Sequence, residues 1–306
     1  MENRSKEEIH LIYSSFGKNE FYRQTILSVF SLFNKLKEDG SKVKIHLFTD
    51  NIDYFKTWFD TFPISYTFLS KEKLVDYMED IKFIHLLKIN IIKNVVAKFS
   101  GKIMYIDSDT FFLQNPITIF EKIDHQHSIL EHDEYAFTEL ENAKDILHKK
   151  SYHLFKDNSF KLIDGSDTKI SIHSRSFCAG VIGFHSSNKQ WLGDIIFLTK
   201  QIYNQLPIFT AEQWSVSHIL QSNSKVSTTT NVLFHYWRKE GKFSVDQLTK
   251  KMMRRNFLFK NKVRINTEID GMIMKDKFEG YIYSSNIFVR LKRRIGPLFD
   301  KFVFKI

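Results

Sequence analysis

The sequence GKIMYIDSDTFFLQNP, residues 101–116, decides the predicted fold. Gly101 ends a helical pattern over 82–99, and the apolar residues 103–106 are typical of a buried strand. Asp107 and Asp109 follow that strand directly. Because residues two apart share one face of a strand, both carboxylates are expected on one side where strand geometry persists.

The two carboxylates predict a metal site. Neighbouring carboxylates at a strand end repel each other unless a cation lies between them. Mn²⁺ or Mg²⁺ prefers oxygen ligands and keeps coordination sites for substrate phosphates. Such an ion stabilises the charge that grows on a departing diphosphate. An Asp-x-Asp pattern is common in surface loops, but the apolar residues on both sides of this one favour metal–diphosphate chemistry over a structural turn.

The residues before this stretch predict an α/β fold with a mostly parallel sheet. A strand is expected at 8–15, a helix at 19–40 and a second strand at 42–50. A strand–helix–strand order favours parallel strands joined by crossover helices. Ligands of such sheets bind at the carboxyl ends of the strands, where Tyr13, Ser14 and Asp50 stand.

The later segments continue the alternation of strands and helices. Residues 128–170 are weakly patterned. The remaining expected elements are strands at 62–69, 175–187 and 231–240, and helices at 117–123, 191–206 and 212–221.

Composition excludes several classes of protein. The chain has 306 residues, of which 42% are hydrophobic, and a single cysteine. Disorder and a disulfide framework are therefore excluded, and a cytoplasmic location is expected. No signal peptide or membrane-spanning segment is expected. The formal net charge is +10, and the excess lies in residues 241–306, which hold 16 basic and 6 acidic residues. No nucleic-acid partner is expected for the neutral remainder.

The basic end predicts a second unit, a mainly helical C-terminal extension at 241–306 beside a catalytic domain at 1–240. In residues 284–306, SSNIFVRLKRRIGPLFDKFVFKI, apolar residues repeat at helical spacing beside arginines and lysines. Such a segment suits an anionic membrane surface, consistent with a peripheral position at the inner face of the membrane. Packing on the catalytic domain is the alternative.

Several motifs together resemble the GT-A-fold glycosyltransferases, close to family 8. KIMYIDSDTFFLQNP (102–116) resembles their DxD strand, and IHLIYSS (9–15) their opening nucleotide-binding strand. HLLKI (85–89), FCAGVIGF (177–184), AEQWSVSHIL (211–220) and FHYWRKE (234–240) follow in the family's order. The chain departs from the family at Cys178, where asparagine is usual, and at Glu212, where aspartate is usual. The late histidine also lacks the family's downstream Gly and Lys-Pro-Trp spacing.

The resemblance implies a hexosyltransferase that uses a nucleotide-diphosphate sugar, with UDP the expected nucleotide, and a glycan or lipid-linked acceptor. A retaining outcome follows from the resemblance alone. The implied metal ligands are Asp107, Asp109 and His235. The implied nucleotide-sugar contacts are Tyr13, Ser14, Asp50, Lys88, Ser108 and Gly180. Where the chain departs from the family after its late histidine, Arg238, Lys239 and Lys242 are the candidate phosphate contacts. Glu212 and Gln213 would face the anomeric carbon or the acceptor, and an inverting enzyme would need Glu212 or Asp133 as its general base.

Each residue also has a purely structural interpretation. In this interpretation, His235 is a buried, hydrogen-bonded histidine, and Lys88 is a solvated charge on the surface of a helix. Glu212 is a carboxylate that stabilises a helix N-terminus, and Cys178 is a small apolar residue that packs in the core. Two interpretations remain for residues 132–134: an exposed loop surface, or a contact with the acceptor sugar through His132, Asp133 or Glu134.

Two other functions remain as alternatives. A sugar-nucleotide pyrophosphorylase would need a glycine-rich basic loop after the first strand, where only Gly17 stands. A non-enzymatic anion- or nucleic-acid-binding protein would use the basic extension, but it would leave Asp107 and Asp109 unexplained.

Overall fold

The computed structural model describes residues 7–259, 274–277 and 279–280. A seven-stranded sheet has the order β12-β6-β11-β4-β1-β2-β3. Its strands are β1 (Ile9–Ser15), β2 (Val43–Thr49), β3 (Ile64–Phe68), β4 (Lys102–Ile106), β6 (His127–Leu130), β11 (Val181–His185) and β12 (Lys225–Thr228). β11 runs antiparallel to both of its neighbours, whereas every other pair in the sheet is parallel. The expected α/β class with a mostly parallel sheet is confirmed.

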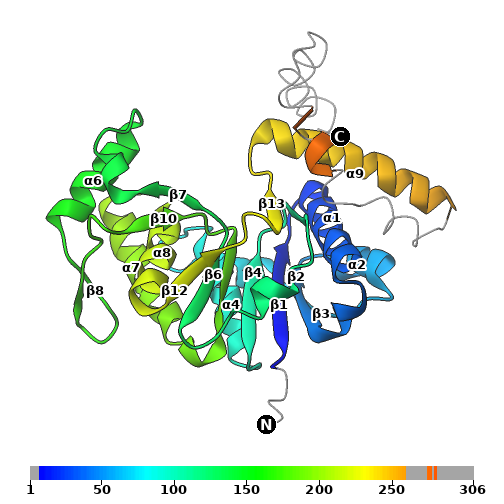
Figure 1. The fold of residues 1–306 in the computed structure, drawn as a ribbon, viewed down its shortest axis with the longest axis horizontal. Helices are drawn as coiled ribbons and strands as arrows, with labels where there is room; N and C mark the ends of the chain where they lie inside the picture. Colours follow the sequence, from blue (N-terminus) through cyan, green and yellow to red (C-terminus); the bar gives the residue numbers. More distant parts are fainter. Residues whose placement is uncertain (1–6, 260–273, 278, 281–306) are drawn as a thin grey trace.

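Helices cover the sheet (Figure 1). They are α1 (Asn19–Leu36), α2 (Ile52–Phe59), α3 (Lys71–Tyr77), α4 (Leu86–Val96), α5 (Ile117–Phe120), α6 (Ile146–Asp157), α7 (Trp191–Gln205), α8 (Ala211–Asn223) and α9 (Lys239–Phe259). Short 3-10 turns lie at η1 (Lys37–Lys42), η2 (Phe137–Leu140) and η3 (Ser186–Asn188). In the described part of the chain, no helix is both long and apolar enough to cross a membrane.

The apolar side chains of the central strands form two cores. Along β4, Ile103 and Tyr105 pack into a cluster with α4, α7 and α8, whereas Met104 and Ile106 pack into a cluster with α1 and α2. Alternate residues of a strand point to opposite faces, so one strand supplies both cores. This two-sided burial explains why the parallel strands have nearly continuous apolar sequences.

Small two-stranded sheets accompany the main sheet. β5 (Thr110–Phe112) pairs with β13 (Leu233–His235), and β7 (Asp133–Ala136) pairs with β10 (Arg175–Phe177). β8 (Phe160–Lys161) pairs with β9 (Asp167–Thr168). The weakly patterned residues 128–170 contain three of these strands and α6, which the sequence did not predict, because short strands leave little periodic signal.

Several expected elements are shorter in the structure. The helix expected at 117–123 is the single turn of α5, and the helix expected at 19–40 ends at Leu36 and continues as η1. The strand expected at 231–240 is reduced to β13, because α9 begins at Lys239. α9 lies against α1 (Figure 1), where Arg23 Nε is 2.6 Å from Asp246 Oδ1. The amphipathic segment expected at 284–306 lies outside the described residues.

Candidate active site

Hydrogen bonds from two sides fix the loop that carries the two aspartates. The Asp107 N–H donates to Gly180 O at 2.8 Å, and the Tyr236 N–H donates to Asp109 O at 3.0 Å. β13 pairs with β5 so that His235 lies opposite Thr110. This register brings His235, 126 residues further along the chain, next to Asp109.

Asp107, Asp109 and His235 lie together at the carboxyl end of β4. One side-chain oxygen or nitrogen of each lies within 4.8 Å of those of the other two. His235 Nε2 is 3.2 Å from Asp109 Oδ2, and Lys242 Nζ from α9 is 2.6 Å from the same oxygen. Two carboxylates and one imidazole are a donor set that suits Mn²⁺ or Mg²⁺.

The two aspartates differ in their electrostatics. Burial raises the pKa of Asp107, because the charge of Lys88 only partly offsets it. Burial also acts on Asp109, but the nearby charges of His235 and Lys242 outweigh it and lower the pKa of that carboxyl. Burial alone would lower the pKa of His235, yet Asp109 and Glu131 raise it well above its usual value.

Lys88 is buried beneath Asp107, so it is not a solvated helix charge. Its Nζ donates to Ala179 O at 3.0 Å and lies 3.8 Å from Asp107 Oδ2 and 3.7 Å from Glu212 Oε1. Burial opposes the charged form, but the two carboxylates outweigh it and raise the pKa of Lys88. The ammonium therefore remains charged at the base of the site.

Glu212 stands in the first turn of α8 and is only 2% exposed. Burial raises its pKa to about 7, although Lys88 acts in the opposite direction. Its Oε1 has no hydrogen-bond partner among the described residues. Gln213, the next residue, donates to Glu134 Oε2 at 2.6 Å and to Ser176 Oγ at 2.7 Å, so it connects α8 to β7 and β10.

The candidates near the first two strands lie in different environments. Ser14 Oγ is hydrogen-bonded to Tyr105 OH at 2.7 Å. Tyr13 is fully buried, and its hydroxyl bonds to Ser28 Oγ of α1 at 3.1 Å, so its side chain belongs to the core. Asp50 accepts the Gly17 N–H at 2.9 Å and the Tyr22 hydroxyl at 2.6 Å, and so holds the loop after β1.

The other candidates also have defined positions. Ser108 Oγ donates to Gln24 Oε1 at 3.4 Å. Lys239 is exposed in the first turn of α9, whereas Lys242 reaches Asp109. Asp133 forms an ion pair with Arg175 across β7 and β10, and no described contact joins it to the aspartate pair.

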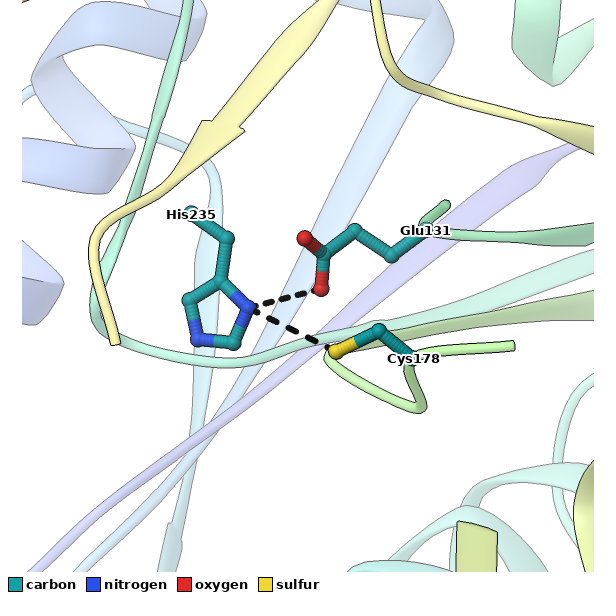
Figure 2. A group of neighbouring side chains, drawn as sticks. All are labelled: Glu131, Cys178 and His235. Atoms are coloured by element: carbon teal, nitrogen blue, oxygen red, sulfur yellow. Dashed lines mark hydrogen bonds and ion pairs between the residues drawn. The ribbon is translucent and has the colours of Figure 1, made fainter. Parts of the chain in front are cut away.

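Sequence reasoning missed Glu131, which Figure 2 shows beside His235 and Cys178. Glu131 follows β6 directly, and its Oε2 lies 2.7 Å from His235 Nδ1. The His132 Nδ1 lies 2.8 Å from the other oxygen of Glu131. β6 runs in the same direction as β4, so Glu131 lies at a strand end as Asp107 does, but the weakly patterned sequence predicted no strand here.

Gly180 and Cys178 complete the surroundings of His235. A Cβ on Gly180 would lie 2.3 Å from Glu131 Oε2 and 2.8 Å from His235 Nδ1, so no larger residue fits here. Cys178 Sγ is 3.8 Å from His235 Nδ1, and burial raises the pKa of this thiol to about 12. Cys178 is therefore a neutral, buried thiol beside the imidazole.

No family model matches the chain, and no curated protein matches its sequence. Among solved structures, the chain is similar to the galactosyltransferase LgtC in complex with donor and acceptor sugar analogues, at 11% identity and a TM-score of 0.49 over 72% of this chain and 74% of that one. It is also similar to the apo form of mouse xyloside xylosyltransferase 1, at 12% identity and a TM-score of 0.46, covering 72% and 84%. For the apo glycosyltransferase GlyE of Streptococcus pneumoniae TIGR4, the identity is 9%, the TM-score 0.47 and the coverage 87% and 64%. All three of these proteins are glycosyltransferases.

Proposed function

We propose that this protein is a metal-dependent glycosyltransferase that transfers a hexose from a nucleotide-diphosphate sugar to a glycan or lipid-linked acceptor. The proposal is supported most directly by the closeness of Asp107, Asp109 and His235, which lie together at the carboxyl end of β4. Ligands of α/β sheets bind at this edge. The proposed donor carries UDP, as the resemblance to family 8 implies.

Asp107, Asp109 and His235 would hold Mn²⁺ or Mg²⁺. When bound there, the ion would supply positive charge that stabilises a diphosphate leaving group. Lys242 adds a second positive charge beside Asp109, and the charge of Lys88, 3.8 Å from Asp107 Oδ2, favours the ionised form of that carboxyl. Oriented charges of this kind stabilise the transition state more than the ground state, because the leaving group gains charge during the reaction.

We propose that Glu212 contacts the reacting sugar. Its carboxyl is buried beside Lys88, and its pKa of about 7 suits a group that accepts or shares a proton near neutral pH. We propose retention of configuration on the resemblance. If the products show inversion of configuration, we propose Glu212 rather than Asp133 as the general base, because Asp133 already forms an ion pair with Arg175.

For the acceptor, we propose the surface formed by Gln213, Glu134 and His132. Gln213 and Glu134 are hydrogen-bonded to each other at 2.6 Å, and His132 Nε2 is 3.9 Å from Glu134 Oε1. Amide and carboxylate groups of this kind bind sugar hydroxyls by hydrogen bonds. We propose a catalytic domain at 1–240 and a basic extension at 241–306 that contacts an anionic membrane surface. The extension starts within α9, so it also supplies Lys242 to the site.

A donor screen tests the proposed function. The purified protein is incubated with Mn²⁺ and a panel of nucleotide sugars, and the release of free nucleoside diphosphate is measured with water as a poor acceptor. We expect release from one donor, its loss with excess EDTA and its recovery when Mn²⁺ is restored. Release that is equal with EDTA would contradict the metal dependence. The absence of release from every donor, with and without simple glycoside acceptors, would contradict glycosyl transfer.

A further inference from the structure

His235 has two ring nitrogens, and they face different groups. Nε2 faces Asp109 Oδ2 at 3.2 Å, and Nδ1 faces Glu131 Oε2 at 2.7 Å. An ion could therefore bind on either side of this ring, beside Asp107 and Asp109 or beside Glu131 and Cys178, and both sets of atoms are close enough. The contacts of Glu131 decide between the two sides.

Both oxygens of Glu131 are already engaged by imidazole nitrogens. Oε1 lies 2.8 Å from His132 Nδ1, and Oε2 lies 2.7 Å from His235 Nδ1. An ionised carboxylate can only accept hydrogen bonds, so each short contact requires an N–H on the imidazole. The Nδ1 of His235 therefore carries a proton that it donates to Glu131.

The backbone holds Glu131 in this position. The Thr229 N–H donates to Glu131 O at 2.8 Å, and the Glu131 N–H donates to Cys178 O at 3.3 Å. Gly180 leaves the space that the carboxylate fills, since a Cβ there would lie 2.3 Å from Oε2. Glu131 itself is only 4% exposed, so water does not compete for its oxygens.

From this geometry we infer that Glu131 is a positioning residue of the proposed metal site. Its carboxylate accepts the Nδ1–H of His235 and so directs Nε2 toward an ion held by Asp107 and Asp109. With Nδ1 engaged by Glu131, Nε2 would offer its lone pair to an ion held by Asp107 and Asp109. Histidine ligands of metals commonly donate their other N–H to a carboxylate, which fixes the ring and makes the ligand more basic. The inference rests on the proposed function, because it needs the metal site.

The test is a double-mutant cycle on Mn²⁺ affinity, measured from the electron paramagnetic resonance signal of free Mn²⁺. Loss of such a partner lowers metal affinity about 10- to 100-fold. We expect the lower end of that range for Glu131→Gln, which keeps the shape of the side chain, and the upper end for Glu131→Met, which removes the acceptor. In the His235→Gln background, Glu131→Gln should cause no further loss, because Glu131 acts through His235.

Two control variants accompany the cycle. Glu139→Gln removes a carboxylate of the same segment whose partner is the Ala136 N–H, and it should leave Mn²⁺ affinity unchanged. Cys178→Ser should change the affinity less than twofold. An equal loss in Cys178→Ser and Glu131→Gln would place the ion on the Nδ1 side and overturn the assignment. Thermal melting of each variant separates a loss of fold from a loss of binding.

The remaining outcomes separate this inference from the proposed function. Mn²⁺ affinity that is unchanged in Glu131→Gln overturns the positioning role. So does a loss of affinity on Glu131→Gln that is equal in the wild-type and His235→Gln backgrounds. Neither result contradicts the proposed glycosyl transfer. A wild-type protein that binds no Mn²⁺ but releases nucleotide from a donor also overturns it. Coupling in the cycle without donor turnover supports the positioning role and contradicts glycosyl transfer.

Discussion

At the scale of single residues, the site gathers charges that each need a partner. Lys88 lies between Asp107 and Glu212, and His235 lies between Asp109 and Glu131. Buried charges are tolerated only when they are paired, because water cannot solvate them. The alternating positive and negative groups therefore hold one another in place around the expected position of the ion.

Glu212 makes stability depend on pH. Its pKa is raised by burial from 4.5 in the unfolded chain to about 7 in the folded one. Between these values the folded protein keeps a proton that the unfolded chain releases, so the contribution of this carboxyl to stability falls as pH rises. Glu212→Gln removes this dependence. Relative to wild type, the variant should gain up to about 3 kcal/mol between pH 4.5 and pH 8.

Urea unfolding of both proteins at several pH values in this range measures that gain. A difference in unfolding free energy that stays constant with pH would show that Glu212 ionises in the folded protein as it does in the unfolded chain.

Gly180 has a steric role at the same scale. In Gly180→Ala, the new methyl group would meet Glu131 and His235, and neither can move without losing its hydrogen bond. Overpacking of this kind costs about 1–3 kcal/mol, and Mn²⁺ affinity should fall with stability. In the control Gly193→Ala, the methyl group would meet only the end of the exposed Ile163 side chain, 2.6 Å away. Urea unfolding should show little change or a gain for this control, and equal losses in both variants would contradict the steric role.

At the scale of elements, strand ends and pairings assemble the site. Glu131 follows β6, Asp107 follows β4 and Gly180 precedes β11, and the directions of these strands bring all three to one edge. β13 then supplies His235 through its pairing with β5. A change in any of these registers would move a ligand to the wrong place.

α9 brings Lys242 to Asp109, and an ion pair with α1 adds to the packing of Val245, which is fully buried in the same apolar cluster as the α1 side chains. Arg23 Nε lies 2.6 Å from Asp246 Oδ1, and both side chains are largely buried. Arg23→Gln should weaken the attachment of α9 to α1. Hydrogen bonds to charged groups are worth about 1.5–3 kcal/mol, so amides of 240–254 should exchange about tenfold to a hundredfold faster.

Hydrogen exchange followed by mass spectrometry measures this effect. In Arg23→Gln, the exchange rates of the β1 amides should be unchanged. In the control Lys44→Gln, which removes a half-exposed ion pair with Glu8, exchange rates should be unchanged throughout the protein. Unchanged exchange in α9 of Arg23→Gln would show that other contacts hold this helix.

At the scale of the whole molecule, local patterns predicted the parts with strong periodicity. The first strand, α1, the second strand and the Asp-x-Asp strand end were all visible in the sequence, because buried strands and amphipathic helices have characteristic spacing. Asp107, Asp109, His235 and Lys88 lie together in the structure, and their roles remain a proposal. Tyr13 does not belong to this group, because its side chain turns into the core.

The parts that could not be predicted depend on distant pairing. The antiparallel placement of β11 and the position of α9 over α1 follow from contacts between segments far apart in the chain. Glu131 stood in an acidic cluster that looked like a surface loop, and only the neighbouring β11 and β13 show that it is buried. Short strands such as β7 and β13 carry too few residues for a periodic signal.

The uneven charge of the molecule leads to a prediction about membranes. The whole excess of +10 lies in 241–306, and each basic residue near an anionic bilayer contributes about 1 kcal/mol to binding. The full chain should sediment with vesicles that contain phosphatidylserine and be released by high salt. Replacing Arg293, Arg294 and Lys301 by Gln should weaken this binding, whereas binding that is equal on neutral vesicles would contradict a membrane role for the extension.

The central claim is that an ion between Asp107 and Asp109 connects the protein to the donor diphosphate. Calorimetric titration of UDP into the protein, with Mn²⁺ and then with EDTA, tests it most directly. The account predicts that Mn²⁺ increases UDP affinity at least about tenfold, equivalent to 1.4 kcal/mol, and that Asp109→Asn abolishes the increase. UDP affinity that is equal with Mn²⁺ and with EDTA, or an increase that survives in Asp109→Asn, would contradict it.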